Sequence, residues 1–301
     1  MSDVSSELVT QLLKERKADR RWKNIRFIAW FVLIVVLLWV FFGTNSTPTL
    51  SGRYVSLLRL EGMIAPESDI SAENIVPLLQ EAFKDKGSQG IILDINSPGG
   101  TPVQASIIHD AILRLKKKYH KKVLVVGEDL LTSGAYYIAV AADEIYVNPN
   151  TITGSIGVIM KGFGFSGLIK KLGVERRVYT SGADKDRLDP FLPQSPQDME
   201  KIHQVINEVH NNFNQAVLEG RKGKLRADPA TLFTGDFWSG QTALKLGLVD
   251  GLGNLNDIAE QQFHTSHFRE YSTSPGLLKM LSSQVSSSWG AFLESISLRL
   301  Q

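Results

Sequence analysis

An alternation of apolar strands, glycine turns and helices constrains the fold of this chain more than any other feature. Residues 90–95 form an apolar run that ends in a Gly-Gly turn, and a helical pattern follows over 103–119. A second apolar run, at 123–126, leads through Ser133 into an Ala-rich helical stretch at 135–142. Strand, turn and helix in this order are typical of βαβ units over a parallel sheet. The sequence therefore predicts a layered α/β domain with its turns gathered at the carboxyl ends of the strands.

Ser133 stands where the second of these strands passes into its helix. The unpaired N–H groups and the positive dipole end of a helix favour a developing oxyanion, so a serine there suits a nucleophile. Serine is also a preferred N-cap residue, and this stretch alone favours neither interpretation. The Gly99-Gly100 pair closes the preceding strand and can turn N–H groups into a cleft, although an isolated Gly-Gly pair is more often a plain tight turn.

A serine nucleophile needs a base, which is usually histidine, but no pattern places any of the six histidines beside Ser133. Lysine is the alternative, provided that desolvation lowers its pKa from about 10.4 towards neutrality. Lys185 follows a strand-like run at 174–180 and a glycine turn. Its neighbours Asp184 and Asp186 would raise that pKa if they lay close to the ammonium group. Without further context, Lys185 is interpreted as a surface loop residue.

An uncharged and almost wholly apolar segment spans residues 27–43. As a helix it would reach roughly 26 Å, close to the thickness of a bilayer core. Seven basic residues precede it, and only Arg53 and Arg59 follow nearby, so the N-terminus is expected to be cytoplasmic and the body exported. No Ala-x-Ala-like site follows the segment. We therefore favour an uncleaved anchor over a cleavable signal peptide.

The charge of the chain argues against nucleic acid as a partner. The net charge of +2 comes from residues 1–26, which hold seven of the 33 basic and four of the 31 acidic residues. The remainder is nearly neutral and forms no strongly basic field. The sequence contains no cysteine, which excludes disulfides, thiol catalysis and cysteine-based metal sites.

Four motifs follow one another in a fixed order along the body. They are Asp94-x-Asn96-Ser97-Pro98-Gly99-Gly100, Ser133-Gly134-Ala135-Tyr136-Tyr137, Thr153-Gly154-Ser155-Ile156-Gly157-Val158 and Gly182-x-x-Lys185. In order and spacing they resemble the signal peptide peptidase A family of Ser-Lys peptidases. Glycines from Gly235 to Gly253 resemble the closing motif of that family, so the resemblance covers about residues 52–262.

The resemblance implies a fold and a set of roles. The fold would be the crotonase-like (Clp protease-like) layered βαβ type, without cofactor or metal. Ser133 would be the nucleophile, Lys185 the general base and Ser155 the hydroxyl that orients the lysine. The oxyanion hole would be formed by the N–H of Gly100, with that of Gly134 as a second candidate donor. The resemblance also implies a bacterial, membrane-anchored peptidase that cleaves hydrophobic peptides such as signal peptide remnants. Its subunits would form a homo-oligomeric ring in which the serine and the lysine can meet across a subunit boundary.

The expected organisation has five parts. They are a cytoplasmic basic tail (1–26), a transmembrane anchor (27–43), a linker (44–52), a Ser-Lys peptidase domain (53–262) and a C-terminal tail with an amphipathic pattern (263–301). The chain would cross the bacterial inner membrane once and place its catalytic domain on the extracytoplasmic side. Two alternatives stay open: an acyl-CoA enzyme of the crotonase type, and a non-catalytic membrane scaffold.

Overall fold

The computed structural model describes residues 21–36 and 53–272, which belong to two separate units divided at Ser51. Residues 21–36 are helical and exposed. The predicted anchor at 27–43 lies partly outside the described residues. Among the residues that are described, no helix is both long and apolar enough to cross a bilayer. The membrane anchor therefore stays a prediction.

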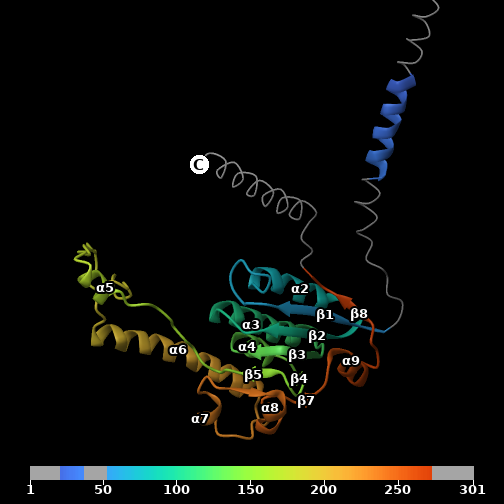
Figure 1. Cartoon of the computed structure of the whole chain (residues 1–301). Coiled ribbons are helices and arrows are strands. Elements are labelled where there is room, and N and C mark those ends of the chain that lie inside the picture. Colours follow the sequence, from blue (N-terminus) through green and yellow to red (C-terminus); the bar gives the residue numbers. More distant parts are fainter. Residues whose placement is uncertain (1–20, 37–52, 273–301) are drawn as a thin grey trace, which may run out of the picture. The chain divides into compact units, whose positions relative to one another are not determined.

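The body is built on one sheet whose strands are mostly parallel (Figure 1). The strands are β1 (Tyr54–Glu61), β2 (Ser88–Ser97), β3 (Val123–Thr132), β4 (Glu144–Val147), β5 (Ile152–Gly154), β6 (Phe237–Ser239), β7 (Gly251–Leu252) and β8 (Phe268–Glu270). Hydrogen-bonded neighbours follow the order β6-β5-β3-β2-β1-β8, while β4 pairs with β3 and β7. Among the described strands, only the pairing of β5 with β6 is antiparallel. The predicted α/β fold with a parallel sheet is confirmed.

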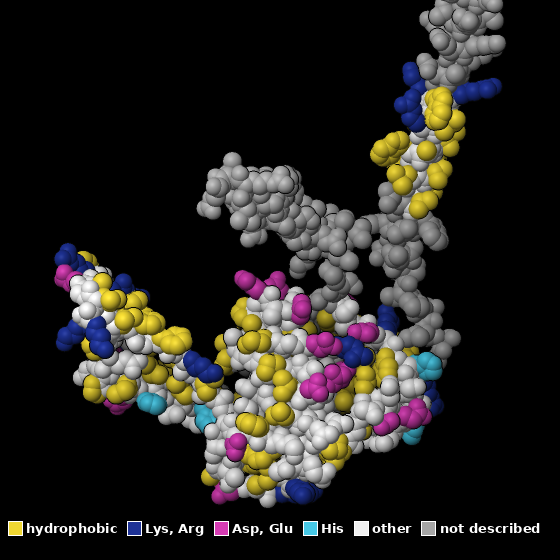
Figure 2. All heavy atoms as spheres, in the orientation of Figure 1, with side chains coloured by type: hydrophobic (Ala, Val, Ile, Leu, Met, Phe, Trp, Pro, Cys, Tyr) yellow, Lys and Arg dark blue, Asp and Glu magenta, His cyan; other side chains and the backbone are white. Residues whose placement is uncertain are grey.

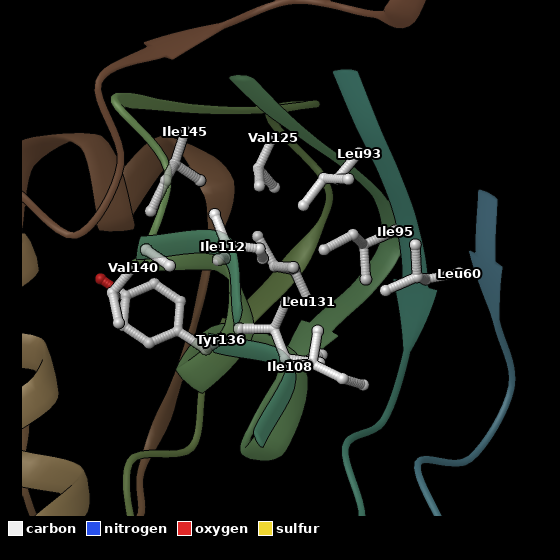
Figure 3. Packing of buried hydrophobic residues seen from close by; sticks show 14 of the residues in the cluster. Leu60, Leu93, Ile95, Ile108, Ile112, Val125, Leu131, Tyr136, Val140 and Ile145 are labelled. Carbon is white, nitrogen blue, oxygen red and sulfur yellow. The ribbon is translucent and has the colours of Figure 1, made fainter. Parts of the chain in front are cut away.

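Helices cover both faces of this sheet, which is why its central strands are almost continuously apolar. The helices of the body are α2 (Ala72–Lys84), α3 (Pro102–Tyr119), α4 (Gly134–Ala139), α5 (Ser166–Lys171), α6 (Pro196–Gly220), α7 (Pro229–Leu232), α8 (Gly240–Leu246) and α9 (Leu255–Phe263). The larger core lies between the sheet and α2, α3 and α4. Figure 3 shows Leu93 and Ile95 of β2 facing Ile108 and Ile112 of α3. A smaller core lies under α9 on the opposite face.

Helix α6 begins at a capped N-terminus. Ser195 accepts a hydrogen bond from the Asp198 N–H, the Asp198 side chain accepts one from the Ser195 N–H, and the two residues form a capping box. Apolar residues at helical spacing from Met199 to Val217 form one face of α6, and this face is buried only towards its C-terminal end, at Phe213 and Val217. The side chain of Met199 remains 45% exposed. The N-terminal part of this face is therefore only partly covered by the described part of the chain.

The segment leading into α6 has no core of its own. No residue from 157 to 212 is buried, and Figure 2 shows hydrophobic side chains on the surface of the part around α5. The strand predicted at 174–180 is wrong, because these residues form no strand. Their β-branched side chains give them strand propensity, but no pairing involving this run is found among the described strands.

The C-terminal stretch contributes to the sheet before it leaves the described residues. Strand β8 lies in the segment predicted as a tail and pairs in parallel with β1, with Val55 opposite Phe268. The sheet therefore extends at least to Glu270. The rest of the tail predicted to be amphipathic, from residue 273 onward, lies outside the described residues.

Candidate active site

Ser133 occupies a strained junction between β3 and α4. Its φ of 54° and ψ of −123° lie outside the regions that non-glycine residues usually adopt. Its N–H donates to the Gly154 carbonyl at 2.8 Å, and its own carbonyl accepts from the Tyr137 N–H at 2.9 Å. Such conformations cost about 1–3 kcal/mol and persist only where the surrounding structure enforces them. The junction thus holds Ser133 firmly in one position.

The hydroxyl of Ser133 is not used as a helix cap. Although Ser133 stands at the N-cap position of α4, its side chain makes no capping hydrogen bond. No other hydrogen bond of this hydroxyl is found within the described part of the chain. The geometry therefore favours the nucleophile over the N-cap interpretation, because capping would occupy the oxygen.

The Gly99-Gly100 loop lies directly against this junction. A Cβ added to Gly99 would lie 2.7 Å from the Cβ of Ser133, and one added to Gly134 would lie 3.2 Å from the backbone N of Gly100. The loop is fixed by Ile64, whose N–H donates to the Gly99 carbonyl at 2.9 Å and whose carbonyl accepts from the Thr101 N–H at 2.8 Å. The close packing explains why Gly99 and Gly100 cannot carry a side chain.

Two backbone N–H groups beside Ser133 remain available as donors. Gly134 is the first residue of α4, so its N–H has no acceptor within the helix. Across residues 53–272, the N–H of Gly100 likewise donates to no backbone carbonyl. Unpaired donors next to a free hydroxyl are the arrangement that an oxyanion hole requires.

A cavity of about 100 Å³ opens at the Ser133 hydroxyl. Its walls combine the glycines with mainly apolar side chains from α3, α4, α6 and the segment after β5. They are Gly100, Pro102, Ala105, Ser133, Gly134, Tyr137, Gly157, Val158, Ile159, Val209 and Phe213. Such a lining suits an apolar peptide side chain held next to the hydroxyl. We call this space the serine cavity.

Ser155 lies beside Ser133 because the residue before each serine belongs to a strand, and these two strands, β3 and β5, pair with each other. Thr132 at the end of β3 is opposite Gly154 at the end of β5, and each serine follows its strand with a positive φ. The Ser155 N–H donates to the Asp236 carbonyl at 2.7 Å. The structure therefore brings four of the five predicted site residues together: Gly100, Ser133, Gly134 and Ser155.

Lys185 is not part of this cluster in a single chain. It is exposed, does not line the serine cavity, and makes no ion pair or side-chain hydrogen bond to any residue that the structure describes. Asp184 pairs instead with Arg187, at 2.8 Å. No histidine, aspartate or glutamate of the described residues lines the serine cavity either. In the described part of one copy, the site therefore holds a candidate nucleophile and donors but no base.

Sequence reasoning did not identify Val209 and Phe213 as walls of the site. Both belong to the apolar face of α6 that the sequence does reveal, and Phe213 also contacts Tyr137, with ring centroids 4.9 Å apart. An apolar stripe does not show which part of the protein it will cover. Only the crossing of α6 over α4 places it at the serine cavity.

The model of peptidase family S49 matches residues 115–267. A putative signal peptide peptidase SppA from Enterococcus faecium is 32% identical over 235 residues, which are 73% of this chain and 68% of that protein. The chain belongs to peptidase family S49. This confirms the family that the four motifs predict.

Two further comparisons limit what can be carried over to this family S49 chain. A Brucella abortus protein described as the Na(+)/H(+) antiporter NhaA is 43% identical over 214 residues, and the match covers 69% of this chain but 29% of that protein. The antiporter name therefore says nothing about this chain. A solved structure of a ClpP1 mutant from Listeria monocytogenes aligns with a TM-score of 0.43 and 18% identity over 67% of this chain and 92% of that one. A TM-score this low supports no inference.

Proposed function

We propose that this chain is a membrane-anchored serine endopeptidase whose nucleophile is Ser133. One observation carries the proposal: an uncapped hydroxyl in a strained strand–helix junction lies beside the unpaired N–H groups of Gly100 and Gly134. Membership of a peptidase family favours this interpretation over an acyl-CoA enzyme or a scaffold. An acyl-CoA enzyme of the crotonase type would share the oxyanion donors but would not need both Ser133 and Lys185, and a scaffold would not need a reactive serine.

The chemistry follows from these groups together with a lysine base. The Ser133 Oγ attacks the scissile carbonyl carbon while the neutral Lys185 Nζ takes the hydroxyl proton, and Ser155 orients the lysine. The oxyanion accepts hydrogen bonds from Gly100 and Gly134. When the C–N bond breaks, the lysine returns its proton to the leaving amine. Water then attacks the acyl ester with the lysine again as base, the bond between the acyl carbon and Ser133 Oγ breaks, and the lysine returns the proton to Oγ as the carboxylic acid leaves.

A second copy of the chain supplies Lys185 in this proposal. The lysine is exposed in the single chain, and a lysine acts as a base only where water is excluded from it. The segment 157–212, which carries Lys185, contains no buried residue. Its apolar side chains Ile159, Phe163 and Leu172 are 74%, 81% and 66% exposed. A neighbouring copy that covers these apolar side chains would desolvate the lysine and complete the site. Repetition of such a head-to-tail contact closes a ring.

The substrates are hydrophobic peptides, such as the remnants of signal peptides. The apolar walls of the serine cavity support this choice, and the proposed anchor at 27–43 would hold the site next to membrane lipid on the extracytoplasmic side. The reaction as written needs no cofactor.

Mixed oligomers test the proposal. Full-length Ser133→Ala and Lys185→Ala chains, each inactive alone, are co-expressed with different tags and purified together in detergent. Suppose that each site takes its serine from one copy and its lysine from a neighbouring copy. Half of the copies then have Ser133 and half have Lys185, so random mixing gives both residues at roughly a quarter of the sites and restores about that fraction of wild-type peptide cleavage. A mixed oligomer without activity would contradict the shared site.

A further inference from the structure

A second and larger cavity adjoins the serine cavity. It encloses about 450 Å³ between α3 and α6, and both cavities share Pro102, Tyr137 and Val209 as lining residues. The two spaces therefore lie next to each other, and Ser133 lines only the smaller one. An extended peptide advances about 3.3–3.6 Å per residue, so a few residues of a substrate would reach from one space into the other.

The charge of the second cavity is negative. Asp110 and Glu219 line it, and no lysine or arginine of the described chain does. Neither carboxylate forms an ion pair with a lysine or arginine in the part of the body that the structure describes. Burial raises the pKa of the Tyr137 hydroxyl between them, and the charges of Asp110 and Glu219 raise it further. Both carboxylates thus act on the same space.

His109 lines the same cavity beside these carboxylates. Only 7% of its side chain is exposed, and its ring meets that of Tyr137 edge-on, with the centroids 5.1 Å apart. Its Nδ1 lies 2.8 Å from the Asp110 carboxylate. In the tautomer that donates from Nδ1 to Asp110, Nε2 is an acceptor, and no described residue forms a hydrogen bond with Nε2. An unused acceptor on the cavity wall is suited to a donor from a ligand.

We propose that Asp110, Glu219 and His109 form a subsite for a cationic group of the peptide cleaved at Ser133. The proposal rests on the peptidase function proposed above. An ammonium group suits the subsite because it carries three donors and no acceptor, whereas the three protein groups offer acceptors. The substrate class is thereby narrowed to apolar peptides that carry a lysine side chain or a free N-terminus a few residues from the scissile bond.

The test uses full-length protein in detergent and matched apolar peptides. One series places a single lysine at successive positions on either side of the cleaved bond, with norleucine at the same position as the neutral match. A second series has free or acetylated N-termini and shows whether the subsite binds the lysine side chain or the α-ammonium group. We measure kcat/KM with active protein and, independently, Kd with Ser133→Ala protein, which binds without cleaving.

Lysine should be preferred over norleucine about fivefold at one or two adjacent positions, in both kcat/KM and Kd, since two exposed carboxylates each contribute a small factor. The double variant Asp110→Asn with Glu219→Gln should abolish the preference, and salt should weaken it. Glu81→Gln removes an exposed carboxylate from α2 and should leave it unchanged.

The subsite would be overturned if the lysine and norleucine peptides bound and were cleaved equally at every position. It would also be overturned if the lysine preference survived in the double variant. Either result would leave the peptidase function intact. Cleavage that persists in Ser133→Ala would instead overturn the peptidase proposal. The lysine preference in Kd would then still decide the subsite by itself.

Discussion

Replacing Gly134 by alanine should separate activity from stability. The added Cβ would lie 3.2 Å from the Gly100 N, 3.4 Å from the Ala105 Cβ and 3.5 Å from the Ile64 Cδ1. Only the first contact is tight, and Gly134 does not have a positive φ, so alanine fits the helix. Alanine is favoured over glycine in a helix by up to about 1 kcal/mol, which offsets the crowding. The free energy of unfolding should therefore change by less than about 1 kcal/mol.

The same methyl group stands beside the Gly100 N–H, where the oxyanion must bind. Loss of one such donor costs about 10²–10³ in kcat, or roughly 2.7–4 kcal/mol. We expect kcat for a fluorogenic apolar peptide to fall about 100-fold, while the thermal midpoint moves by less than about 4 °C. Gly100→Ala is the comparison, because its Cβ would overlap the Ile64 carbonyl and should reduce stability as well. A Gly134→Ala variant with more than half of the wild-type kcat would refute this oxyanion hole.

Four further outcomes are expected. Lys185→Arg keeps the charge but cannot deprotonate, so peptide turnover should fall as far as in Lys185→Ala, and retained turnover would exclude a lysine base. Ser155→Ala should reduce kcat by about 10- to 100-fold, because it orients the base without reacting; an unchanged kcat would remove that role. Burial raises the pKa of Asp94 to about 6, so the native state keeps a proton that the unfolded chain loses above about pH 4. In denaturant titrations, the free energy of unfolding of the wild type relative to Asp94→Asn should fall by about 2–3 kcal/mol between about pH 4 and pH 7. If the free energies of the two proteins changed in parallel with pH, the raised pKa of Asp94 would be contradicted. Protease added to intact spheroplasts should digest the body and spare the residues before 27, whereas digestion only after lysis would reverse the topology.

The sequence predicts those elements whose signals are local. The strand at 90–95 and the helix at 103–119 occur in the structure, because their hydrophobic periodicity and glycine turns lie within the segments themselves. Strand β3 extends beyond the predicted 123–126 to Thr132. Its later residues owe their strand conformation to pairing with β5, where Leu130 lies opposite Ile152. Such a contact between separate segments leaves no local pattern.

The candidate site also has features that the sequence predicts and features that it does not. The positions of Gly100, Ser133 and Gly134 follow from two strand–turn–helix units, whose turns meet at one edge of a parallel sheet. That the Ser133 hydroxyl makes no cap bond could not be predicted, because the residue type alone allows capping. The position of Lys185 could not be predicted either, since a loop without buried residues is placed by what it contacts and not by its own sequence.

Active-site labelling identifies the nucleophile itself. The full-length protein is treated with a serine-directed fluorophosphonate, and the modified residue is located by mass spectrometry of its peptides. We predict one adduct on Ser133, its absence in Ser133→Ala, and loss of peptide cleavage in proportion to labelling. An adduct on another serine, or full cleavage by protein whose Ser133 is completely modified, would contradict Ser133 as the nucleophile.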